Sequence, residues 1–93
     1  MRQIEWTGAM KRDYRRVMAN PHHRDLNQLL GGIVSLLSED RPLSPSQHDH
    51  ALTGDWKDHR DCHIKPDLVL IYRKPNADVL QLVRIGSHSE LGF

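Results

Sequence analysis

The first forty residues carry apolar side chains at the spacing of amphipathic helices. Residues 3–6 fit a short strand, and Thr7 is a suitable N-cap for a helix over residues 8–19. A second helix is predicted over residues 22–38, because apolar residues recur there at helical spacing. Those residues are Leu26, Leu29, Leu30, Ile33, Val34 and Leu37. Since only a short connection around Asn20 and Pro21 separates the two segments, we expect an αα-hairpin.

The hydrophobic period changes after a linker rich in Pro and Ser, residues 39–47. Beyond it, three segments are short, rich in β-branched residues and bounded by turn residues: 56–64, 68–73 and 79–85. Such segments are typical of strands, and the tight turns between them favour antiparallel pairing. The sequence therefore predicts an α+β fold, in which an N-terminal strand and the αα-hairpin pack on a mostly antiparallel sheet.

Side chains of the first of these three strands are expected to alternate between its two faces. One face carries Lys57, His59, Asp61 and His63. The other face carries Arg60, Cys62 and Ile64. We expect the helices to cover the apolar face of the sheet and to leave the ionisable face open.

Length and composition limit the possible classes of protein. The chain has 93 residues, so residues 1–93 are expected to form a single domain with one modest core. Its 13 basic and 12 acidic residues leave a net charge of +1, which argues against binding nucleic acid by bulk electrostatics. The one cysteine, Cys62, excludes an internal disulfide and favours a reducing, cytoplasmic setting. No segment approaches membrane-spanning length, so no membrane partner is expected.

Three histidines lie around the predicted strands of the C-terminal half: His50, His63 and His88. The imidazole group ordinarily titrates at about pH 6.5, so histidines that converge can give and take protons near neutral pH. This pattern indicates a candidate site for proton transfer.

Four motifs in the same half of the chain indicate a family. They are D-H-A-L-T-G-D-W at 49–56, R-D-C-H at 60–63, P-D-L-V-L-I-Y at 66–72 and R-I-G-S-H at 84–88. Together they resemble the YafQ branch of the RelE/ParE toxin superfamily, and the predicted order of elements agrees over the whole chain. The resemblance implies a small RelE-like fold and a ribosome-dependent endoribonuclease. Such a protein is the toxin of a type II toxin–antitoxin pair and cleaves mRNA in the A site of the 70S ribosome.

The resemblance also implies catalytic roles for His50, His63, Asp67 and His88. The family usually ends H-x-x-L-F, whereas this chain has Gly92 between Leu91 and Phe93. Phe93 is still expected to stack on an RNA base, because a glycine permits unusual backbone angles.

Arg60 and Arg84 are candidate RNA-binding residues, because a guanidinium matches two phosphate oxygens in a bidentate fork. Bound to phosphate, they stabilise the charge that grows on the phosphoryl oxygens. The alternative for each is an ion pair with Asp or Glu, which is common for arginines in sheets.

The implied reaction needs two proton carriers and neither a metal nor another cofactor. A base removes the proton of a 2′-hydroxyl, the oxygen attacks the adjacent phosphorus, and an acid protonates the departing 5′-oxygen. Each histidine fits either role, and Asp67 is expected to orient or charge one of them. The implied partners are mRNA, the ribosome and a cognate DinJ- or RelB-like antitoxin that binds the N-terminal helices.

Two other functions compete with this interpretation. One is a metal site, because several zinc-capable residues crowd positions 48–50, 58–59 and 61–63. Against it, no ligand set has CxxC or helical HxxxH spacing, and alternation turns Cys62 away from His63. The other is a noncatalytic, ParE-like toxin, although the resemblance implies that toxins of that kind lack this set of histidines.

Overall fold

The computed structural model describes all 93 residues. Its helices and strands, in chain order, are β1 (Gln3–Trp6), α1 (Gly8–Met18), α2 (Leu26–Ser38), β2 (His50–Ala51), β3 (Arg60–Lys65), β4 (Leu68–Asn76), β5 (Val79–Gly86) and α3 (His88–Leu91). Three 3₁₀ turns lie between them: η1 (Pro21–His23), η2 (Pro45–Gln47) and η3 (Gly54–Trp56).

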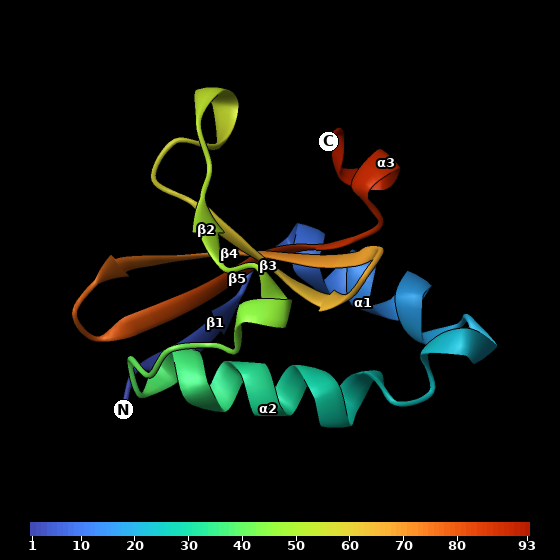
Figure 1. Ribbon diagram of the computed structural model, residues 1–93, viewed down its shortest axis with the longest axis horizontal. Coiled ribbons are helices and arrows are strands. Elements are labelled where there is room, and N and C mark those ends of the chain that lie inside the picture. The colour runs from blue at the N-terminus through green and yellow to red at the C-terminus, as the bar shows by residue number, and fades with distance from the viewer.

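The five strands form one sheet in the order β1-β5-β4-β3-β2. β1 runs parallel to β5, and every other neighbouring pair is antiparallel. In Figure 1, α2 lies along one side of the sheet, whereas the loop after β2 and the helix α3 stand on the other side. This arrangement confirms the predicted α+β fold with an N-terminal strand and a mostly antiparallel sheet.

The main core lies between the helices and one face of the sheet. Met10 and Val17 of α1 are buried there with residues of α2 and of β3, β4 and β5. The residues of α2 are Leu26, Leu30, Ile33 and Leu37. These four residues of α2 belong to the apolar stripe that predicted this helix. Thr7 caps α1 as predicted, since its Oγ1 accepts a hydrogen bond from the backbone N of Met10 at 3.0 Å.

The second helix starts later than predicted. It begins at Leu26 rather than at residue 22, because Pro21–His23 form the separate turn η1. The side chain of Asn20 caps this turn by accepting a hydrogen bond from the backbone N of His22 at 3.0 Å. The resulting helix, α2, has 13 residues, and no helix of the protein is long and apolar enough to cross a membrane.

The first predicted strand of the C-terminal half also starts later. The segment 56–64 holds the end of η3, a short turn and most of β3. Gly54 opens η3 with φ of 65°, a left-handed conformation that glycine adopts without strain. Lys57 and His59 therefore precede β3 and do not share its face with Asp61, so that part of the prediction is wrong. The two-residue strand β2 is absent from the prediction, because it is too short to show alternation.

The second face of the sheet is not fully open, which corrects a further expectation. Val69, Ile71 and Leu91 are buried on it, and three half-buried residues pack around them. These are Leu52, Trp56 and Val83. β4 is thus buried on both faces, which explains why its apolar residues run without alternation from Leu68 to Tyr72.

Candidate active site

Asp67 and His88 form a hydrogen-bonded pair. Asp67 lies in the turn between β3 and β4, and His88 is the first residue of α3. Oδ1 of Asp67 accepts hydrogen bonds from Nδ1 of His88 at 2.7 Å and from its backbone N at 3.1 Å. These two bonds hold the pKa of Asp67 below its ordinary value of 3.8, so the carboxylate is ionised at neutral pH. Because a carboxylate only accepts, His88 carries a proton on Nδ1, and its Nε2 is left for a substrate.

A capping box sets the start of α3. The hydroxyl of Ser87 accepts a hydrogen bond from the backbone N of Glu90 at 3.2 Å, and Oε1 of Glu90 accepts one from the backbone N of Ser87 at 2.8 Å. Glu90 also pairs with Arg16 of α1, Oε2 to Nε at 2.8 Å, and Leu91 is buried against the sheet. Local sequence and tertiary contacts together therefore position His88.

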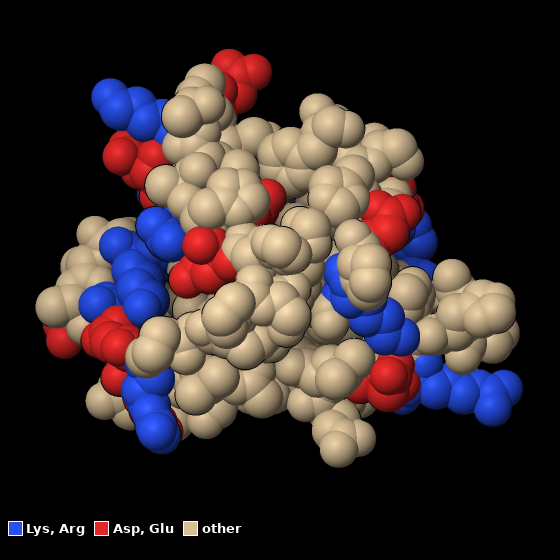
Figure 2. All heavy atoms as spheres, viewed as in Figure 1, with Lys and Arg blue, Asp and Glu red and all other residues tan.

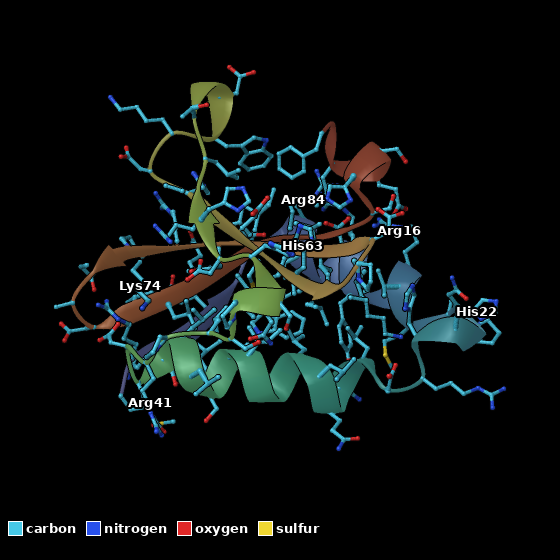
Figure 3. All side chains as sticks on the ribbon, viewed as in Figure 1. Arg16, His22, Arg41, His63, Lys74 and Arg84 are labelled. Carbon is cyan, nitrogen blue, oxygen red and sulfur yellow. The ribbon has the colours of Figure 1, made fainter.

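His63 lies in a row of aromatic rings. Its ring centroid is 5.1 Å from that of His48 on one side and 5.1 Å from that of His88 on the other. Partial burial, together with the neighbouring His88 and His48, lowers the pKa of His63 below its ordinary value of 6.5. His63 is therefore mainly unprotonated at neutral pH and able to accept a proton. Figure 3 shows it near the middle of the sheet, between β2 and α3.

His50 and Asp61 lie opposite one another on the paired strands β2 and β3. Nδ1 of His50 is 2.7 Å from the carbonyl oxygen of His48 and 3.1 Å from Oδ1 of Asp61. Both oxygens can only accept while Asp61 is ionised, so the proton of His50 lies on Nδ1 and its Nε2 is free. Asp61 is 4% exposed, and its Oδ1 accepts no well-aligned hydrogen bond. Burial raises the pKa of Asp61, and the nearby histidines offset this only in part.

Phe93 continues the row of rings beyond His88. Gly92 ends α3 with φ of 83°, and the backbone N of Phe93 then donates to the carbonyl of His88 at 2.9 Å. The ring centroids of Phe93 and His88 are 6.4 Å apart, and Phe93 is 47% exposed. The inserted glycine thus leaves Phe93 beside the histidines, with a free face. Its base-stacking role stays a prediction.

Both predicted RNA-binding arginines are engaged in ion pairs. Arg84 contacts Asp13 of α1 twice, Nε to Oδ2 at 2.5 Å and Nη2 to Oδ1 at 3.2 Å. Arg60 contacts Asp49, Nε to Oδ1 at 3.2 Å, with 45% of its own side chain exposed. The geometry matches the ion-pair alternative, and phosphate binding by either residue stays a prediction.

Two residues of this cluster lie outside the predicted catalytic set: His48 and Asp61. Asp61 is two positions before His63 on β3, so strand alternation was an available signal for it. His48 adopts a left-handed backbone, φ 48° and ψ 44°, after η2. This conformation brings its ring to His63 and its carbonyl oxygen to His50, and no pattern in the sequence marks it in advance.

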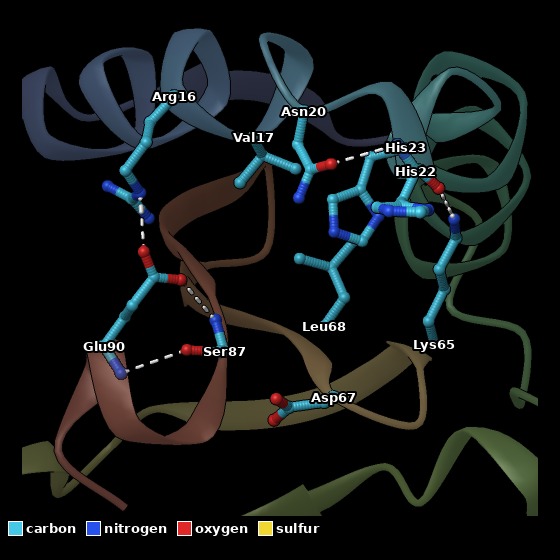
Figure 4. Close-up of a pocket in the computed structure, with 10 residues that line it drawn as sticks. All are labelled: Arg16, Val17, Asn20, His22, His23, Lys65, Asp67, Leu68, Ser87 and Glu90. Carbon is cyan, nitrogen blue, oxygen red and sulfur yellow. Dashed lines mark hydrogen bonds and ion pairs between the residues drawn. The ribbon is translucent and has the colours of Figure 1, made fainter.

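A hollow of about 500 Å³ adjoins Asp67 on the side of α1 and η1 (Figure 4). Its cations are paired within the protein. Arg16 binds Glu90, and Nζ of Lys65 lies 2.8 Å from Oδ1 of Asp25. The hollow therefore offers no free positive charge to a substrate phosphate.

The candidate metal ligands of the sequence do not gather into one group. No group of three or more His, Cys, Asp or Glu side chains is close enough to hold a metal ion. Cys62, the softest of the candidate ligands, is fully buried in the core under the helices.

Comparison with known proteins defines the class and the family. A family model described as "Bacterial toxin of type II toxin-antitoxin system, YafQ" matches residues 2–92. The mRNA interferase toxin YafQ of Escherichia coli K12 is 36% identical over 90 residues, which cover 97% of this chain and 95% of that protein. The class is therefore a bacterial toxin of a type II toxin–antitoxin system. The chain belongs to the YafQ family, and it is an endoribonuclease, which excludes the noncatalytic ParE-like alternative.

Solved structures agree with this family. YafQ in the E. coli DinJ–YafQ complex is 34% identical, has a TM-score of 0.82, and the match covers 98% of each chain. A metal-bound toxin from Helicobacter pylori is 43% identical, has a TM-score of 0.87, and the match covers 98% of this chain and 99% of that one. The latter binds a metal, whereas the present chain lacks a ligand group of three.

Proposed function

We propose that this protein cleaves mRNA in the ribosomal A site by metal-free general acid–base catalysis. The observation that supports it is the placement of His63 beside the hydrogen-bonded pair of His88 and Asp67. His50 and the buried Asp61 complete the cluster. Imidazoles this close, in different electrostatic environments, are what paired acid and base catalysis requires.

In the proposed reaction, His63 is the base, because its lowered pKa keeps it unprotonated. It takes the proton of the 2′-hydroxyl, and the 2′-oxygen attacks the adjacent phosphorus. The bond from phosphorus to the 5′-oxygen breaks, and that oxygen takes a proton from Nε2 of His88. This step requires a proton on each nitrogen of His88, with Asp67 holding the one on Nδ1, and His50 lies beside the reacting groups with its Nε2 free. The products are a 2′,3′-cyclic phosphate and a 5′-hydroxyl.

The charge of the chain supports the proposed dependence on the ribosome. The net charge is only +1. On the face shown in Figure 2, basic and acidic atoms lie next to one another, and the middle of the face is largely uncharged. A chain that makes few phosphate contacts binds free RNA weakly, so the ribosome has to present and orient the message. The proposed substrate implies that the protein acts in the cytoplasm, where ribosomes hold mRNA.

Mapping of cleavage ends tests the proposal. Wild-type protein should cut messages on programmed ribosomes and leave naked RNA intact, with a 5′-hydroxyl on the downstream fragment. His88→Ala should lower the rate of cleavage by about 10²–10⁴-fold and leave ribosome binding unchanged. His22→Ala is the matched control, because His22 is an exposed histidine on η1 whose side chain makes no hydrogen bond in the protein. Efficient cutting of naked RNA, or unchanged cutting by His88→Ala, contradicts the proposal.

We also propose that a DinJ-like antitoxin binds the N-terminal helices and β1. An apolar hollow of about 290 Å³ opens there, lined by residues of β1, α1, α2 and β5. Ile4 on its rim is 44% exposed, and β1 is an edge strand with a free side. Exposed apolar surface next to an open strand edge favours a partner that adds backbone hydrogen bonds and apolar side chains.

Copurification tests this partner. Ile4→Glu should abolish retention of the antitoxin encoded beside this chain, while Gln3→Glu, on the neighbouring exposed position of β1, should not. Equal retention of the antitoxin by both variants rules out this surface.

A further inference from the structure

A second hollow, of about 530 Å³, opens beside His63 on the side away from His88 and Phe93. Its walls are residues 44 and 46–48, from η2 and its ends, and residues 63–66, from β3 and the following turn. Phe93 and this hollow lie at opposite ends of the row of rings. If RNA runs along this row with its scissile phosphate over His63 and His88, one flanking nucleotide lies near Phe93 and the other near this hollow.

The lining favours a neutral ligand over a phosphate. Lys65 is its only Lys or Arg, and Nζ of Lys65 is already held 2.8 Å from Oδ1 of Asp25 and 2.8 Å from the carbonyl oxygen of His22. The other polar groups are serine hydroxyls, an amide and imidazoles. A phosphate requires free positive charge, whereas an RNA base requires donors, acceptors and a flat ring to stack on. The ring of His48 supplies such a surface.

Gln47 has a fixed orientation in this wall. Its Oε1 accepts a hydrogen bond from the backbone N of Ser44 at 3.0 Å, as part of a capping box around η2. Because an N–H donor requires the oxygen end of the amide, the NH₂ end of Gln47 is left free to donate. An amide held in this way is a preorganised donor for a base.

We propose that this hollow binds the base of the mRNA nucleotide that flanks the scissile phosphate on the side away from Phe93. The amide of Gln47 donates a hydrogen bond to the base, and the ring of His48 stacks on it. The inference rests on the proposed function and adds the contact that selects where a message is cut.

Gln47→Glu tests the contact, since it keeps the acceptor that Ser44 needs and removes both amide donors. Gln28→Glu, on the exposed face of α2, is the matched control for the same chemical change. Cleavage is measured on ribosomes programmed with messages that vary one base on either side of the cut. Gln47→Glu should change the preference between bases at one of these positions by about tenfold, and Gln28→Glu should leave it unchanged.

Messages with an abasic nucleotide test the same contact in the unaltered protein. At one flanking position, loss of the base should slow wild-type cleavage about tenfold, and on that message wild type and Gln47→Glu should cleave equally. If neither abasic position slows the wild type, the proposal is overturned. It is also overturned if Gln47→Glu slows every message equally. Cleavage by the wild type and its loss in His88→Ala are read in the same assay, so a failure of the proposed function is seen separately.

Discussion

Asp13 and Asp61 are almost equally buried, at 3% and 4% exposed, but their surroundings differ. Asp13 accepts hydrogen bonds from Arg84, Arg16 and the backbone N of Ile85. Oδ1 of Asp61 accepts no well-aligned hydrogen bond and has only the imidazole of His50 close by. Asp13 is therefore hydrogen-bonded to cationic side chains, whereas Asp61 lies beside histidines and lacks a well-aligned donor.

The pKa values of these two carboxyl groups move in opposite directions. Burial alone would raise the pKa of Asp13, but the hydrogen bonds from Arg84 and Arg16 outweigh it and hold that pKa below 3.8. Burial raises the pKa of Asp61, because the histidines compensate only in part. Equal burial therefore leaves the ionised form favoured where hydrogen-bond partners are complete, and favours the neutral form where they are incomplete. Perturbed pKa values of the second kind are typical of functional sites.

The largest effect is expected at the histidine cluster. His88→Ala should lower the rate of cleavage by about 10²–10⁴-fold, because one positioned proton donor is lost. The melting temperature should change little, since α3 is held by Leu91 and by the pair of Glu90 with Arg16. Single-turnover cleavage on ribosomes and thermal unfolding measure the two quantities. A collapse of thermal stability would show that His88 serves the fold.

The next effect concerns the satisfied carboxylate. Asp13→Asn should lower the free energy of unfolding by about 2–4 kcal/mol, because it leaves Arg84 and Arg16 without their shared anion. Urea titration measures this change, and cleavage per folded molecule should be nearly unaffected. Asp40→Asn is the control, since Asp40 also pairs with two cations but is exposed. If both variants lose a similar free energy of unfolding, burial of the carboxylate does not determine the size of the effect.

Asp61→Asn should behave in the opposite way. A carboxyl group with a raised pKa binds its proton more tightly in the folded state, so its ionisation lowers stability as the pH rises above 3.8. At pH 7 the variant should be at least as stable as the wild type, and the difference should shrink as the pH falls toward 4. Cleavage should drop by roughly tenfold, because His50 loses its neighbouring charge. Strong destabilisation at pH 7 would mean that ionised Asp61 stabilises the fold, as ionised Asp13 is expected to do.

The smallest effect is a pKa change at His63. Burial lowers this pKa first, and His88 and His48 lower it further. His88→Gln removes one of these charges, so the pKa of His63 should rise. NMR titration of the imidazole resonances measures it, with His22 as the internal control. In the wild type, the acidic limb of the pH–rate profile should lie below 6.5. An unchanged His63 titration in the variant would mean that the two imidazoles are not coupled.

The sequence alone predicted the element types and the ionisable residues. Apolar stripes marked α1 and α2, β-branched segments marked three strands, and the motifs around His50, His63 and His88 marked the site. These features are local, because helical and strand periods are set by neighbouring residues. α3 was not predicted, although Ser87 and Glu90 have the spacing of a capping box and mark its start in the sequence. The missed boundaries at η1 and η3 depend on short turns, whose signals are weak.

Only the tertiary structure decided which polar residues are partners. Arg84 and Asp13 are 71 positions apart, and His88 and Asp67 are 21 apart. Asp13 and Asp61 both have basic neighbours in the sequence, and no local pattern shows that Asp13 contacts two arginines while Asp61 lies beside histidines. The left-handed backbone of His48 likewise matters only because it places this residue against His50 and His63 in the folded chain. Charge interactions depend on distance and burial, and both are properties of the folded chain.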